Sequence, residues 1–197
     1  NTGGKPLNAQ ELRNCLMNNA ARETLRNMAM SKEFITATGN SITDIRMQGQ
    51  EMAMRFIYFY NLYYPNHDGI KEYNGLIDDS LDGLVDKLRK LSKEQLSEYE
   101  EKYKAAMKNA YYLFGRHSFR KVNQETNNES GRSQINKALF VSLSVILSQY
   151  DFNEIKNKFE KNSFIFVLGK DIDTNPDLFY YLSYGTNGAR NVIYTFK

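Results

Sequence analysis

Apolar side chains recur three and four residues apart along almost the whole chain, which is the pattern of amphipathic α-helices. The segment 44–64 is apolar on most of its sides, as expected of a buried central helix. Only three prolines interrupt the 197 residues, so long helices are allowed. The apolar run 164–168 has strand propensity but no partner strand, and we expect it to be helical or irregular. The sequence predicts an all-α fold, an irregular bundle of about eight or nine helices.

Several helix starts can be placed from the sequence. A capping residue stands three positions before Glu or Gln in three places, which is the spacing of a capping box: Asn8 with Glu11, Ser92 with Gln95, and Asp151 with Glu154. Leu7 and Leu12 have the spacing of a hydrophobic staple. Asn175 followed by Pro176 marks another start, and Thr186 is a candidate cap for the last helix.

Two neighbouring segments are expected to form a helical hairpin. Residues 73–91 and 96–113 carry matching apolar seams and are joined by a short connection, which is typical of antiparallel helix pairs. The polar stretch 123–132 is the candidate border between subdomains. We otherwise expect residues 1–197 to form a single helical domain. Because the chain begins without methionine inside a Gly-Gly loop, we expect it to be a fragment of a larger protein.

Composition restricts the classes of function. The net charge of +3 is too small to indicate nucleic-acid binding by itself. Cys15 is the single cysteine, which rules out an internal disulfide and fits a reducing cytosol. The two histidines, His67 and His117, are far apart in sequence, and we expect no metal site. Apolar runs are too short to span a bilayer. We therefore expect a cytoplasmic protein without membrane contact.

The N-terminal loop is the first candidate site. Gly3, Gly4 and Lys5 precede a helix start, where glycine backbone, a lysine charge and the helix dipole can together hold a phosphate. Arg13 lies one turn into the helix and joins them as a candidate nucleotide-binding residue. The spacing is not that of a P-loop. A tight turn without a ligand is the competing interpretation, and spacing alone favours it.

The second candidate site is the basic segment 115–121. Arg116, His117, Arg120 and Lys121 surround a phenylalanine, a combination that can contact nucleic-acid phosphates and bases. Cations also suit the negative end of a helix dipole, so a purely structural role stays open. Arg190 follows a Gly-Thr turn that can seat an anion, although a plain joint between helices explains the turn as well.

The central helix carries a further charged group. Glu51 and Arg55 have the i,i+4 spacing of an ion pair, and we expect them to pair in the interior and tie helices together. An anion site built from Arg46 and Arg55 is the sharper alternative. No serine–histidine–aspartate set, paired carboxylates or metal-dependent nuclease motif can be assembled, so we expect no catalytic residues in this chain.

The opening residues 1–8, together with Glu11-Leu12-Arg13-Asn14, resemble a signature of the GmrSD-type restriction family. This is a large prokaryotic group with a ParB/sulfiredoxin-like N-terminal domain. Weaker matches follow along most of the chain: Arg46 with Glu51 and Arg55-Phe56, then Phe114-Gly115 with Phe119-Arg120, then Gly185-Thr186. The resemblance places the chain in the helical part that follows the family's N-terminal core.

The resemblance implies cytoplasmic defence against foreign DNA. Family members couple nucleotide hydrolysis or DNA sensing in the N-terminal domain to a nuclease domain. The family's Asp-Gly-Gln-Gln-Arg motif and its HNH-like segment are absent from this sequence. The resemblance thus implies no cofactor in this chain and a nucleoside triphosphate in the complete protein. It also implies that Gly3, Gly4 and Arg13 line the edge of a nucleotide or DNA site.

Two functional hypotheses follow. In the first, the chain is a helical domain that supports the missing N-terminal domain and contacts DNA. In the second, it is a helical protein-interaction module that assembles with partners or with itself and touches no nucleic acid.

Overall fold

The computed structural model describes residues 4–64 and 70–197. Eleven α-helices and two short 3-10 turns make up the regular structure of these residues. The first half contains α1 (Ala9–Leu16), α2 (Asn19–Met30), α3 (Lys32–Thr38), η1 (Ile45–Met47), α4 (Gln48–Tyr63) and α5 (Ile77–Leu88). The second half contains α6 (Lys93–Phe114), η2 (Gly115–His117), α7 (Lys137–Leu147), α8 (Phe152–Lys158), α9 (Phe164–Thr174), α10 (Pro176–Ser183) and α11 (Ala189–Thr195).

The all-α class is confirmed, and the expected number of helices was too low. One reason is visible at Ser31, where α2 ends and α3 begins with no loop between them. The Ser31 hydroxyl donates to the carbonyl of Met28 at 2.8 Å and accepts from the amide of Phe34 at 3.3 Å. One side chain therefore ends one helix and begins the next. Within the described residues the only β-type pairing is an isolated bridge between Arg120 and Ile135.

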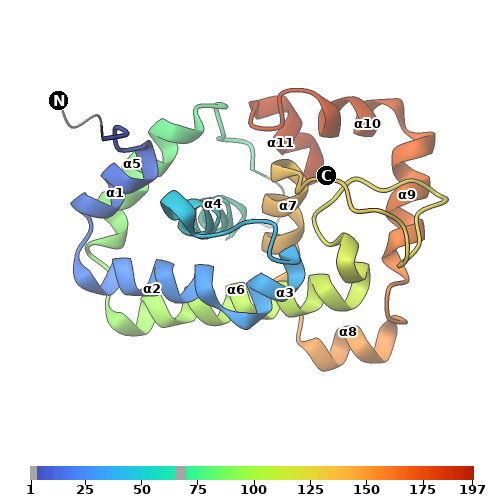
Figure 1. The fold of residues 1–197 in the computed structure, drawn as a ribbon, viewed down its shortest axis with the longest axis horizontal. Coiled ribbons are helices and arrows are strands. Elements are labelled where there is room, and N and C mark those ends of the chain that lie inside the picture. Colours follow the sequence, from blue (N-terminus) through green and yellow to red (C-terminus); the bar gives the residue numbers. More distant parts are fainter. Residues whose placement is uncertain (1–3, 65–69) are drawn as a thin grey trace.

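Helix α4 lies at the centre of the molecule (Figure 1). Helices α2 and α6 run along one side of it, α1 and α5 lie at one end, and α8 to α11 gather at the other. Helix α7 packs against both α4 and α6 and links the central helices to the C-terminal group. The central position of α4 agrees with its apolar character on most sides, since Met52, Met54 and Phe56 are all buried.

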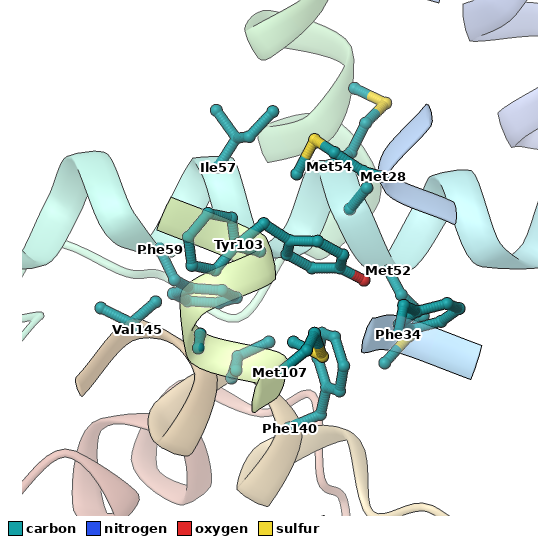
Figure 2. Packing of buried hydrophobic residues seen from close by; sticks show 14 of the residues in the cluster. Met28, Phe34, Met52, Met54, Ile57, Phe59, Tyr103, Met107, Phe140 and Val145 are labelled. Atoms are coloured by element: carbon teal, nitrogen blue, oxygen red, sulfur yellow. The ribbon is translucent and has the colours of Figure 1, made fainter. Parts of the chain in front are cut away.

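Aromatic rings from distant helices meet in the core (Figure 2). Tyr103 on α6 lies 5.1 Å from Phe56 and 5.8 Å from Phe34, measured between ring centroids. Phe140 on α7 completes the group from the opposite side, edge-on to Phe34 at 6.3 Å. Edge-to-face and tilted contacts of this kind favour one specific packing over a loose apolar cluster. The Tyr103 side chain is fully buried, and its hydroxyl has no hydrogen-bond partner among the described residues.

The expected hairpin of α5 and α6 is wrong. Helix α6 packs chiefly against α7, α3 and α2, whereas α5 packs against α4 and α1. The apolar seam of α6 is used by the aromatic core, because Tyr103 faces rings from α3, α4 and α7. A regular seam therefore correctly indicated a buried helix face but not which helix covers it.

Local predictions at helix ends were more successful. Both halves of the capping box are present at Asn8–Glu11 and at Ser92–Gln95. Asp151 caps α8 by accepting from Asn153, without the reciprocal bond expected from Glu154. The expected cap at Thr186 is wrong, because a turn from Gly185 to Gly188 delays the start of α11 until Ala189. Asn175 caps α10 as expected, with Pro176 at its first position.

Candidate functional site

The glycine-lysine loop enters α1 as an exposed segment. Gly3 lies outside the described residues, and Gly4 and Lys5 are exposed. Among the described residues, no atom lies within 4 Å of the position that a side chain on Gly4 would take. The loop ends at Asn8, whose side chain accepts from the Glu11 amide at 2.8 Å while Glu11 accepts from the Asn8 amide at 2.7 Å. The capped start of α1 is therefore well ordered by its own hydrogen bonds.

Glu11 also pairs with a residue from the start of the central helix. Its two carboxylate oxygens accept from Arg46 at 2.7 and 3.2 Å, which is bidentate geometry. Arg46 further donates to the carbonyl of Pro6 at 2.6 Å, and its own carbonyl accepts from the Asn8 side chain at 2.9 Å. The hydrogen bonds from Arg46 hold the pKa of Glu11 below its ordinary value. The loop, the cap and η1 thus form one hydrogen-bonded unit.

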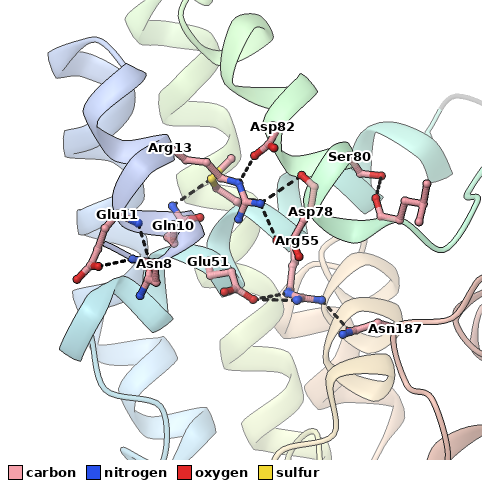
Figure 3. Close-up of polar contacts among 12 residues, drawn as sticks. Asn8, Gln10, Glu11, Arg13, Glu51, Arg55, Asp78, Ser80, Asp82 and Asn187 are labelled. Atoms are coloured by element: carbon pink, nitrogen blue, oxygen red, sulfur yellow. Dashed lines mark hydrogen bonds and ion pairs between the residues drawn. The ribbon is translucent and has the colours of Figure 1, made fainter. Parts of the chain in front are cut away.

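Arg13 is held by two carboxylates of α5 (Figure 3). Its Nε donates to Asp82 at 2.7 Å and its Nη2 donates to Asp78 at 2.7 Å, and the side chain is 2% exposed. Burial lowers the pKa of Arg13, but the two aspartates outweigh it and the net shift is upward. The guanidinium therefore ties α1 to α5, and its charge is balanced within the protein.

The expected ion pair on α4 is confirmed. Glu51 accepts from Arg55 at 2.8 Å, with both side chains largely withdrawn from solvent (Figure 3). Arg55 also donates to the side chain of Asn187 at 3.0 Å, which ties the loop before α11 to α4. Lys137 at the start of α7 lies 3.6 Å from the same Glu51 oxygen. One carboxylate therefore serves two cations.

The basic segment does not present its cations together at the surface. Arg116 is exposed, and Lys121 is partly buried with its ammonium 3.1 Å from the Ser183 hydroxyl. His117 is only 1% exposed and is hydrogen-bonded to the carbonyl of Asn127 at 2.8 Å. Arg120 is 2% exposed. Arg190, on α11, is exposed. Arg116, Lys121 and Arg190 are therefore the members of the expected set that solvent reaches.

Arg120 is a buried cation whose partners are neutral. Its guanidinium donates to the carbonyls of Ser133 and Thr38 and to the hydroxyl of Ser41. Its Nε is buried without a partner among the described residues. Desolvation lowers the pKa of Arg120, and the positive charges of Arg132 and Arg116 lower it further. Hydrogen bonds satisfy most of this side chain, but no carboxylate of the described residues balances its charge.

A pocket of about 440 Å³ opens beside Arg120. It combines three cationic side chains with hydroxyl and amide groups and a small apolar wall; its lining is Ser41, Ile42, Met52, Arg120, Arg132, Ser133, Gln134, Ile135 and Lys137. Sequence reasoning did not select Arg132 or Lys137. The available signal was Arg132, the one cation in the polar stretch 123–132.

Comparison of the chain with protein-family models, with curated proteins and with solved structures finds no match. Among the residues that the structure describes, no group of three or more histidine, cysteine, aspartate or glutamate side chains is arranged to hold a metal ion. No helix within the described ranges is both long and apolar enough to cross a bilayer.

Proposed function

We propose that the chain is the helical domain of a prokaryotic restriction or phage-defence protein of the GmrSD type. In this role it supports a nucleotide-dependent nuclease core and contacts DNA. The observation that carries the proposal is the ion pair between Glu11 and Arg46. These residues are 35 positions apart in the sequence, and their side chains lie 2.7 Å apart in the structure. Both residues belong to the pattern that resembles the family. Their pairing supports the interpretation of that pattern as one structural unit rather than as scattered coincidences.

Other residues of the same pattern also have buried structural roles. Arg13 is paired with α5, and Glu51 is paired with Arg55. Arg120 links the segments around Thr38 and Ser133. A pattern in which the polar residues hold the interior together is expected where a family shares a helical scaffold, since buried charges tolerate few replacements.

The surface of α1 supports a role in holding a neighbouring domain. Leu7, Leu12 and Leu16 are 56%, 51% and 64% exposed, so the predicted staple residues stand largely in solvent. Leu12 and Leu16 border a groove of about 530 Å³ between α1 and α5. Leu12 and Leu16 lie on α1 and Leu7 just before it, and exposed leucines grouped in this way are typical of contact surfaces. We assign this surface to the N-terminal core that the resemblance implies.

DNA contact is assigned to Arg116, Lys121 and Arg190, the expected DNA-contacting residues that solvent reaches. Cations that bind phosphates release counterions, so binding must weaken as salt rises. We expect a duplex to bind the chain at low salt and the double variant Arg116→Ala/Lys121→Ala to bind more weakly, with a shallower dependence on salt. Fluorescence anisotropy of a labelled duplex across a salt series measures both quantities.

The matched control is Lys156→Ala/Lys158→Ala, which removes two exposed lysines from α8. It lowers the net charge equally but leaves the proposed contact intact. If the two double variants weaken duplex binding equally, the effect comes from net charge and not from a specific contact. Affinity that is insensitive to both salt and the Arg116/Lys121 substitutions would contradict DNA contact.

The defence role needs a test in cells. Expression of the complete protein should lower the number of plaques formed by a phage panel that includes phages with modified DNA. Plaque numbers equal to those of an empty-vector strain across the panel would count against the proposal.

A protein-interaction module without DNA contact is the second candidate function. The exposed leucines at α1 fit this candidate as well, because they can bind a partner or a second copy of the chain. In that case Leu12→Asp/Leu16→Asp should abolish self-association or partner capture, measured by light scattering, while the duplex fails to bind the wild type at any salt concentration. DNA binding that survives these leucine substitutions would favour the first candidate.

A further inference from the structure

We propose that the pocket beside Arg120 binds a diphosphate group, either as free pyrophosphate or as part of a nucleotide. Three cations, Arg120, Arg132 and Lys137, line this pocket. The inference does not rest on the DNA contact proposed above, which uses Arg116, Lys121 and Arg190. It rests on an unbalanced buried charge, on the way Arg132 is positioned, and on the size and lining of the pocket.

The first argument is the charge of Arg120. A buried guanidinium normally pairs with a carboxylate, because neutral partners replace only part of its lost hydration. Here the partners are the carbonyls of Thr38 and Ser133 and the hydroxyl of Ser41, and Nε has none within the described residues. An anion in the pocket would supply the missing opposite charge.

The second argument is the position of Arg132. It is exposed, yet its guanidinium lies against Gly39 and donates to the Gly39 carbonyl at 3.3 Å. A side chain on Gly39 would overlap this guanidinium, so the glycine makes the room that Arg132 occupies. Arg132 and Arg120 line the same pocket, and the charge of Arg132 lowers the pKa of Arg120. Two like charges held together in this way favour a ligand of opposite charge.

The third argument concerns the class of ligand. Lys137 adds a third cation and shares its nearby carboxylate, Glu51, with Arg55. A single sulfate- or phosphate-sized ion would fill little of a pocket of about 440 Å³, which is within the range of small-molecule sites. A diphosphate group carries several negative charges and spans more than one cation. The guanidinium groups of arginine can donate two parallel hydrogen bonds to phosphate oxygens, and the ammonium group of lysine adds a further positive charge.

The experiment is isothermal titration calorimetry of the whole chain with pyrophosphate at low ionic strength. We expect binding by the wild type, with Arg132→Gln and Lys137→Gln each weakening it about tenfold, as expected for one charge-assisted hydrogen bond. Arg26→Gln removes an exposed arginine of α2 outside the pocket and should leave the affinity unchanged. Circular dichroism checks that each variant keeps its helical content.

Arg120→Lys is a further variant that keeps the charge and removes the fork. If it fails to fold, the two exposed positions, Arg132 and Lys137, still decide the question. Adenosine triphosphate and a DNA duplex are titrated in parallel. Tighter binding of the nucleotide than of pyrophosphate, lost in the same variants, identifies a nucleotide as the source of the diphosphate.

Two outcomes would overturn the proposal. One is the absence of pyrophosphate and nucleotide binding at millimolar concentration, including the case in which the duplex alone binds. The other is binding that Arg132→Gln and Lys137→Gln leave unchanged, since the ligand would then lie elsewhere.

Discussion

The hydroxyl of Tyr73 donates to the backbone carbonyl of Asn187 at 2.7 Å, although 114 residues separate them in sequence. Arg55 donates to the side chain of the same asparagine. The loop between α10 and α11 is therefore fastened to the centre of the molecule twice. Tyr73 is therefore a useful counterpart to Tyr103: both rings are buried, but the Tyr103 hydroxyl has no partner within the part of the chain that the structure describes.

Replacing each tyrosine by phenylalanine should have opposite effects on stability. Tyr73→Phe leaves the Asn187 carbonyl without its donor, and we expect a loss of about 1 kcal/mol in the free energy of unfolding. Tyr103→Phe removes an unpaired buried hydroxyl, and we expect no loss and a gain of up to about 1 kcal/mol. Urea denaturation followed by circular dichroism measures both. A larger loss in Tyr103→Phe than in Tyr73→Phe would contradict the hydrogen-bond assignment.

Two glycines should likewise respond in opposite directions to alanine. Gly83 lies inside α5 with no atom within 4 Å of an added methyl group, so Gly83→Ala should stabilise the protein by about 0.5–1 kcal/mol through helix propensity. Gly39 has φ of +61°, a backbone conformation that strains any other residue, so Gly39→Ala should destabilise the protein by more than about 1 kcal/mol. The denaturation midpoints of the two variants should fall on either side of the wild-type midpoint.

The ion pair between Glu11 and Arg46 should stabilise the folded protein by an amount that depends on pH. The folded-state pKa of Glu11 is held below the ordinary value of 4.5, mainly by the hydrogen bond from Arg46. The contribution is therefore present above that value and is lost as the pH falls through the folded-state pKa. Glu11→Gln should be less stable than the wild type at pH 7, and the difference should shrink in acid. A difference that stays constant down to pH 3 would mean that the ion pair is not its source.

His117 should remain neutral to a lower pH than an exposed histidine. Burial lowers its pKa below 6.5, and the charges of Arg116, Arg120 and Arg132 add to this against the opposing hydrogen bond to Asn127. The unfolded chain then takes up the proton first, so stability falls as the pH drops below about 6.5 toward the folded-state pKa. Proton NMR of the imidazole C–H resonances, assigned with His117→Gln, measures the midpoint. A midpoint at or above 6.5 would contradict the buried placement.

The sequence predicted local features well where they depend on neighbouring residues. The caps at Asn8, Ser92 and Asn175 and the ion pair of Glu51 with Arg55 each involve partners within four positions, so spacing alone defines them. Residues 164–168, which we expected to be helical or irregular because they have no partner strand, form the start of α9.

Features that depend on distant packing could not be predicted in the same way. The partners of Arg13 and Arg46 are 65–69 and 35 residues away, and nothing in the spacing identifies them. The pocket beside Arg120 needs Arg132 from an irregular loop and Lys137 from the start of α7. This group of cations forms only when the segments around residues 39, 120 and 132 pack together in the fold. The spacing of apolar residues along the sequence therefore cannot predict it. The interpretation of residues 123–132 as a border between subdomains stays a prediction.

The burial of Tyr103 also makes its absorbance a probe of unfolding. The chain has no tryptophan, so its near-ultraviolet signal comes mainly from tyrosine. Complete burial raises the pKa of the Tyr103 phenol well above its ordinary value, and we expect this ring to form tyrosinate only after the aromatic core opens. After a jump to strong alkali, exposed tyrosines ionise at once, while the absorbance of Tyr103 should rise only with unfolding. The part of the slow phase that is lost in Tyr103→Phe then reports the rate at which the core opens.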